Sequence, residues 1–143
     1  MHNNDFVTIR GELVITLRGA DGSIKEQRKV NTVTTAGKAG IADQILASPS
    51  LGTPTHMAIG TSTPGGSALG TELDRNALTS KTRSGAVVTM VGDWAAGDGT
   101  GAITEAGLFD ASSSGNMWCS ASFGVVTKAA GDALSISWTL TIS

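Results

Sequence analysis

The chain has 143 residues, which matches one domain of ordinary size. Only 15% of the residues are charged and the formal net charge is −2, so no general electrostatic attraction to nucleic acid or to an anionic membrane is expected. The hydrophobic fraction of 40% is high enough for a packed core, which argues against intrinsic disorder. We therefore expect one globular domain over residues 1–143, with a short N-terminal arm at about residues 1–5.

So few charges leave a surface rich in Ser, Thr, Gly and Ala. Such short side chains lose little conformational entropy when a partner covers them. This composition suits a protein packed against neighbours, and it is also common in secreted β-proteins. Cys119 is the only cysteine, so no disulfide can form within the chain, and no apolar stretch approaches the roughly 20 residues of a membrane-spanning helix. We expect a soluble protein that is made in the cytoplasm.

The charges are unevenly distributed along the sequence. Residues 1–42 contain six Lys or Arg residues, whereas residues 84–143 contain Lys128 as the single cation beside five acidic residues. One interpretation is that the basic part meets an acidic neighbour or the acidic part of a second copy. The other is that the two groups mark differently solvated faces of one domain.

The first elements in chain order are a hairpin and a helix. Apolar and polar residues alternate along 7–17, which predicts a half-buried strand, and the turn residues of 19–22 lead into a charged partner strand at 23–30. A helix is predicted at about 36–47, with Thr34 or Thr35 as its N-cap and Ser48-Pro49 at its end. Its apolar stripe consists of Ile41, Ala42, Ile45 and Leu46.

The rest of the chain alternates strand patterns with turn signals. The predicted strands are 56–60, 78–81, 85–91, 102–109, 117–126 and 133–143, and a surface loop rich in Gly and Pro occupies 61–70. The last strand is the clearest, because its even positions from Leu134 to Ile142 are all apolar. Strands at this spacing with a single helix predict a mainly β fold, either an antiparallel β-sandwich or a jelly-roll-like barrel.

The residues that catalysis or metal binding requires do not gather in the sequence. His2 and His56 are far apart, Cys119 has no partner at zinc-site spacing, and no phosphate-binding or nucleophile motif is present. The Gly-rich segment 93–101 lacks the ligand spacing of an EF-hand, so a strand connection is expected there rather than a Ca²⁺ site. A carboxylate-pair hydrolase would need Glu105 and Asp110 to meet, and the chain lacks stacking aromatics for a sugar substrate. We expect no enzyme, no cofactor and no metal.

Four segments in a fixed order carry a resemblance to known proteins. They read Asn31-Thr32-Val33-Thr34-Thr35-Ala36-Gly37-Lys38; Met57-Ala58-Ile59-Gly60-Thr61-Ser62 with Leu69-Gly70-Thr71-Glu72-Leu73-Asp74-Arg75; Thr104-Glu105-Ala106-Gly107-Leu108-Phe109-Asp110-Ala111; and Ser135-Ile136-Ser137-Trp138-Thr139-Leu140-Thr141-Ile142. Together they resemble a family of small virion structural proteins of tailed bacteriophages, and their order spans most of the chain. The shortened loop at Pro64-Gly65-Gly66 departs from that pattern.

The resemblance implies a component of the phage virion, assembled in the cytoplasm of the host bacterium. Because the chain is compact and lacks the repetitive shaft or receptor tip of a fibre, we expect a capsid decoration, or cement, protein that binds the assembled shell in many copies and stabilises it. The implied partners are the major capsid protein and copies of the chain itself, as a homo-oligomer (dimer or trimer), with no direct nucleic acid and no membrane. A tail, collar or fibre-attachment component is the first alternative, and a carbohydrate-binding β-sandwich for host adhesion is the second.

Five residues are candidates for structural or interface roles. Glu105 is expected to tie down the backbone N–H groups of a neighbouring loop, in which case Glu105→Ala lowers stability by roughly 1–3 kcal/mol. The alternative for Glu105 is a solvated strand residue. Arg10, Arg18, Arg28 and Lys29 are expected on an exposed face or edge, where they are either solvated or dock as a group on an acidic partner surface.

Overall fold

The computed structural model describes residues 8–32 and 36–143. The predicted N-terminal arm and the N-cap candidates Thr34 and Thr35 lie outside the described residues. The described chain contains these elements in order: β1 (Ile9–Arg18), β2 (Ile24–Thr32), α1 (Ala36–Gln44), β3 (His56–Gly60), β4 (Glu72–Ala77), β5 (Ser80–Ser84), β6 (Val87–Trp94), β7 (Gly101–Phe109), β8 (Met117–Lys128) and β9 (Ala133–Ile142).

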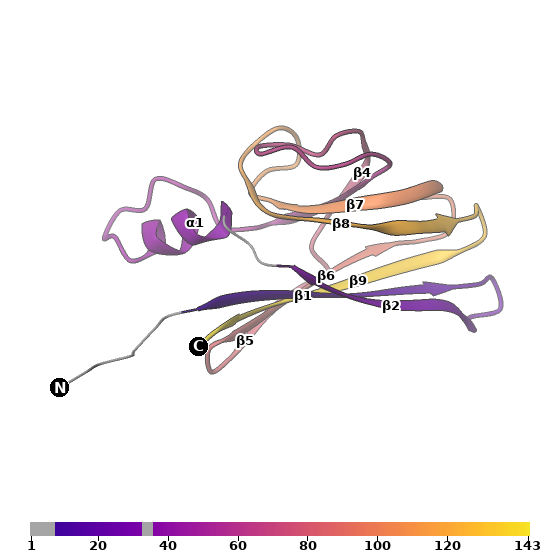
Figure 1. Ribbon diagram of the computed structural model, residues 1–143, viewed down its shortest axis with the longest axis horizontal. Coiled ribbons are helices and arrows are strands. Elements are labelled where there is room, and N and C mark those ends of the chain that lie inside the picture. The colour runs from indigo at the N-terminus through magenta and orange to yellow at the C-terminus, as the bar shows by residue number, and fades with distance from the viewer. Residues whose placement is uncertain (1–7, 33–35) are drawn as a thin grey trace.

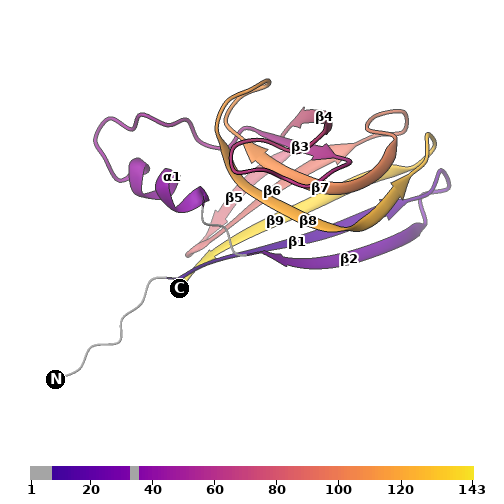
Figure 2. The same ribbon diagram turned by 45° about the horizontal axis from the view of Figure 1, so that its top comes forward.

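The strands form two antiparallel sheets that lie one above the other (Figure 1). One sheet has five strands in the order β2-β1-β9-β6-β5, and the other has four in the order β4-β3-β7-β8. Neither sheet closes into a barrel, and the turned view in Figure 2 shows the same two layers. The mainly β prediction is confirmed, and of its two expected architectures the structure is the β-sandwich.

The core lies between the sheets and follows from the alternation in the sequence. Leu13 and Ile15 of β1 face inward, and so do the even residues of β9, among which Trp138 is fully buried. The register aligns Leu13 with Trp138 and Ile15 with Ile136, so inward side chains of neighbouring strands lie next to each other. The four-stranded sheet contributes the opposite wall of the core from β3, β7 and β8.

Two strand predictions need correction. The strand expected at 78–81 is β5 (Ser80–Ser84), and β4 (Glu72–Ala77) lies in a segment with no predicted strand. Charged residues interrupt the period-2 pattern of β4, but pairing with β3 and the contacts of Arg75 hold the segment extended. The hairpin and the strands predicted at 56–60, 85–91, 102–109, 117–126 and 133–143 are confirmed, with boundaries that differ by a few residues.

The helix is shorter than predicted. It ends at Gln44, because the N–H groups of Ile45 and Leu46 bond to the carbonyls three residues earlier and tighten the last turn. The expected apolar stripe therefore divides: Ile41 packs against the core, whereas the Ile45 side chain is 84% exposed. The helix projects from one end of the sandwich, and the β1–β2 turn lies at the opposite end (Figure 1).

Candidate functional site

Glu105 holds the loop that connects β3 to β4. Its side chain is 0% exposed, and its carboxylate accepts hydrogen bonds from the backbone N–H groups of Ser62 (2.8 Å), Gly70 (2.7 Å) and Thr71 (2.9 Å). This is the loop contact expected of Glu105 from the sequence. Three charge-assisted bonds to one buried carboxylate fix both ends of the loop against β7.

Close backbone packing around Glu105 explains two glycines of the Ala-Ile-Gly-Thr and Leu-Gly-Thr-Glu motifs. A Cβ at Gly60 would collide with the Thr71 carbonyl oxygen and with the Glu105 carboxylate. At Gly70 a Cβ would collide with the carbonyl oxygen of Thr63. Only glycine lets the loop backbone approach the carboxylate this closely.

This loop packs on part of the outer face of the four-stranded sheet. Leu69, near the end of the loop, is 8% exposed and packs with Ala58, Phe109 and Met117 in a small second apolar cluster. Glu105 and Phe109 both belong to β7. This strand therefore holds the loop in two ways, through the hydrogen bonds to Glu105 and through the apolar contact of Leu69 with Phe109. The loop thus covers the part of this sheet face around Phe109.

Arg75 and Asp110 brace the neighbouring turn. The Arg75 guanidinium lies 3.7 Å from the centre of the Phe109 ring, donates to the carbonyls of Ala111 (3.0 Å) and Ser114 (2.9 Å), and pairs with Glu72 at 2.6 Å. Sequence reasoning missed this brace, although Arg75 belongs to one of the four resembling segments.

Asp110 has partners of its own and does not meet Glu105. It accepts hydrogen bonds from Asn116 through the backbone N–H (2.7 Å) and the side-chain amide (2.8 Å). Partial burial works to raise the pKa of Asp110, but the Asn116 bonds outweigh it and the net pKa is lowered. Asp110 and Glu105 thus each hold a different segment, the first at Asn116 and the second in the β3–β4 loop.

An ionic network holds the other end of the sandwich. Lys25 of β2 pairs with Asp132 at 2.9 Å, and Asp132 also accepts the N–H of Ala129 at 2.9 Å. Lys128, 1% exposed, donates to the carbonyl of Ala95 at 3.0 Å. These contacts join the start of β2 to the β8–β9 connection and the end of β8 to the β6–β7 connection, so part of the uneven charge distribution is neutralised within one molecule.

This network predicts a specific acid sensitivity. The hydrogen bonds from Lys25 and from the Ala129 N–H lower the pKa of Asp132 below its ordinary value of 3.8. A lowered pKa contributes stability that is present above the ordinary value and is lost as the pH falls through the folded-state pKa. Lys25→Ala should therefore move the acid-unfolding midpoint to higher pH, measured by circular dichroism across a pH titration. Lys29→Ala is the matched control, because Lys29 lies 3.5 Å from Glu12 in an exposed pair and its loss should leave that midpoint in place.

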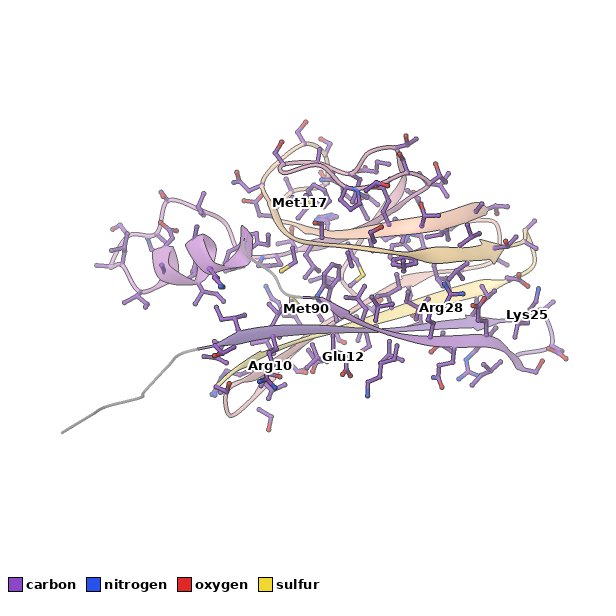
Figure 3. The ribbon with its side chains drawn as sticks, in the orientation of Figure 1. Arg10, Glu12, Lys25, Arg28, Met90 and Met117 are labelled. Atoms are coloured by element: carbon purple, nitrogen blue, oxygen red, sulfur yellow. The ribbon has the colours of Figure 1, made fainter. Side chains whose placement is uncertain are left out.

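The four predicted interface cations do not form one group. Arg10, Arg18 and Lys29 have exposed side chains, but Arg28 faces the four-stranded sheet, where it donates to the carbonyls of Gly124 and Val125 (Figure 3). The sequence predicts Arg28 and Lys29 on an exposed face or edge; both lie on the edge strand β2, but their side chains point to opposite sides, because they are neighbouring residues of a strand. Arg28 instead connects the edge strand β2 to β8.

No described segment covers the outer face of the five-stranded sheet (Figure 1). Short polar and β-branched side chains point outward from its three central strands: Val14, Thr16, Val87, Thr89, Val91, Ser135, Ser137, Thr139 and Thr141. Their registers place Val14, Ser137 and Val91 in one row across the sheet. Arg10 and Glu12 lie on the same side of β1 (Figure 3). We call this surface the open face.

The described residues contain no group of three or more His, Cys, Asp or Glu side chains arranged to hold a metal ion. In the segment 93–101, Gly97, Gly99 and Gly101 adopt positive φ, and the N–H of Gly97 bonds to the carbonyl of Ala130. Within residues 8–32 and 36–143, no helix is long and apolar enough to cross a membrane.

The sequence and the structure were compared with known proteins. No family model, no curated protein and no solved structure matches this chain.

Proposed function

We propose that the protein is a structural component of a tailed-phage virion, a decoration protein that binds the assembled capsid through its open face. The observation that carries this proposal is the difference between the two sheets. The loop that Glu105 holds packs on part of the outer side of the four-stranded sheet, whereas no described segment covers the outer face of the five-stranded sheet. A two-sheet domain with one broad uncovered face is suited to lying flat on a larger surface.

The chemistry of the open face supports a protein surface as the partner. Its Ser, Thr and Val side chains have few rotatable bonds, so little conformational entropy is lost when they are covered. The three Trp residues, which would serve as stacking platforms for a glycan, are all buried. A face of this kind gives each copy a modest affinity, and a regular shell offers many equivalent sites.

A binding assay tests the location on the particle. Purified protein is mixed with phage heads or with isolated tails prepared without it, the particles are pelleted, and bound copies are counted by mass spectrometry. The proposal predicts binding to heads in a number that matches the repeats of the shell lattice. Binding to tails alone would contradict it and would select the tail alternative, and retention of the protein on a glycan array would select the adhesion alternative.

The exposed cations at the border of the open face predict a salt effect. Arg10→Glu with Lys29→Glu should leave the fold intact but release the protein from particles at lower salt than the parent, because screening weakens the remaining attraction to an acidic partner. Retention on pelleted particles across a NaCl titration measures this. Lys38→Glu, at an exposed residue of α1 and outside the five-stranded sheet, is the control. Equal retention of the double variant and the parent would show that these cations are only solvated.

A further inference from the structure

An apolar groove opens beside α1, at the end of the sandwich opposite the β1–β2 turn. Its volume is about 340 Å³, and apolar side chains from the helix and both sheets line it: Ile41, Val88, Met90, Trp118, Leu140 and Ile142. Lys81 and Arg83, two exposed cations of β5, border the same groove. A segment that binds in this groove should insert apolar side chains. Negative charge beside those side chains should strengthen binding, because Lys81 and Arg83 border the groove.

The loop of residues 45–50 has those properties. Ile45 is 84% exposed and Leu46 is 58% exposed, which makes them the most exposed large hydrophobic side chains among the described residues. The Asp43 carboxylate lies at the base of this loop, where it accepts hydrogen bonds from the Ser50 N–H (3.2 Å), the Ser50 hydroxyl (2.9 Å) and the Leu51 N–H (2.8 Å). The loop therefore presents an apolar tip on a negatively charged base.

Several contacts hold the loop in place before any partner binds. Gln44 donates to the carbonyl of Leu51 at 2.9 Å, which closes the loop together with Asp43. The indole N–H of Trp118 donates to the carbonyl of Gly52 at 2.9 Å, and a Cβ at Gly40 would lie within 2.7 Å of the same indole ring. Trp118 thus anchors both the helix and the end of the loop. A loop ordered in this way loses little entropy when its tip is buried.

We propose that two copies of the chain associate by exchanging these loops. Ile45 and Leu46 of each copy enter the apolar groove of the other, and Asp43 approaches Lys81 and Arg83 across the contact. A two-fold arrangement uses loop and groove of both copies, so the contact is closed and stops at a dimer. The open face takes no part in this contact, so the inference is independent of capsid binding and is tested on the purified protein alone.

Sedimentation velocity over a range of protein concentrations tests the exchange. The parent chain should sediment as a concentration-dependent dimer. A loop variant, Ile45→Ser with Leu46→Ser, should show half that mass, and so should a groove variant, Thr53→Trp with Arg83→Glu, which fills the mouth and reverses a border charge. All four positions are exposed, so folding is expected to be unchanged and is checked by circular dichroism. Val125→Ser, a similar change at an exposed residue outside the groove, should remain dimeric.

Mixing the two monomeric variants gives the decisive result. The loop variant retains a groove and the groove variant retains a loop, so an equimolar mixture can form one of the two original contacts and should dimerise more weakly than the parent. A parent that stays monomeric at every concentration would overturn the proposal, and so would a loop variant as dimeric as the parent. A mixture that stays monomeric while the parent dimerises would also overturn it. Should the groove variant fail to fold, the loop variant compared with Val125→Ser decides the question.

Discussion

Replacement of Glu105 by alanine is expected to lower the free energy of unfolding by about 3 kcal/mol, the largest effect of any polar substitution in the four-stranded sheet. The substitution removes the acceptor of three backbone N–H groups, and hydrogen bonds to a charged group contribute roughly 1.5–3 kcal/mol each. The sum is smaller than three full bonds, because Ser62, Gly70 and Thr71 are exposed enough for water to replace part of the loss. Urea unfolding followed by tryptophan fluorescence measures the change.

Two further variants identify the cause. Glu105→Gln keeps the shape but turns an amide N–H₂ toward backbone donors, so its stability should fall between those of the parent and the alanine variant. Glu12→Ala removes an exposed carboxylate from β1 and should change stability by less than about 0.5 kcal/mol. Protease cleavage within 61–71 should accelerate in the alanine variant. If Glu105→Gln matches the parent in both assays, the carboxylate only fills space and the account of the loop is wrong.

Ser137→Arg should weaken binding to the capsid by about a hundredfold, equivalent to roughly 2.7 kcal/mol. Ser137 lies at the middle of the open face, between Val14 of β1 and Val91 of β6 in the register. A long charged side chain at this point keeps a flat partner from contacting the sheet. Where contact does form, the guanidinium is desolvated, which lowers the binding affinity. The fold should tolerate the change, because the Ser137 side chain points away from the core.

Thr127→Arg is the matched control for this prediction. It makes the same kind of change at an exposed residue of β8, in the other sheet. Pelleting with phage heads over a range of protein concentrations gives the apparent affinity of each variant. Equal affinities for Ser137→Arg and the parent would remove the open face from the binding surface, whatever the location of the protein on the particle.

The parts of the fold that the sequence predicted are those governed by local periodicity. Strands β1 and β9 alternate apolar and polar residues because one side of each faces the core, and this pattern needs no knowledge of the partner strand. Strand β4 has no such pattern. Its stability comes partly from the contact of Arg75 with the ring of Phe109 in β7, which local periodicity does not reveal. Beyond the tightened last turn of α1, Asp43 accepts hydrogen bonds from Ser50 and Leu51 and Gln44 donates to Leu51, contacts that helix periodicity does not signal, so it placed the helix end too late.

The candidate site divides in the same way. Glu105 was found because a single acidic residue sits within an otherwise small and apolar strand, a local signal. The pairing of Lys25 with Asp132 joins residues 107 positions apart and has no local signal. The side to which Arg28 points has no local signal either, because a charged edge strand has few apolar residues that would mark its inward positions. The open face and the groove depend on how the two sheets and α1 pack together, so no local signal in the sequence marks them.

Thermal release of DNA from phage particles is the most direct test of the proposed reinforcement of a capsid by this protein. Particles that lack the protein should still assemble, because a small bound domain is not the subunit that builds the lattice. They should release DNA at a lower temperature than complete particles, and added purified protein should restore the release temperature, since a ligand that binds only the intact shell stabilises that state. The Ser137→Arg protein should fail to restore it. Particles that keep full thermal resistance without the protein, yet lack tails or fail to adsorb to cells, would contradict the account.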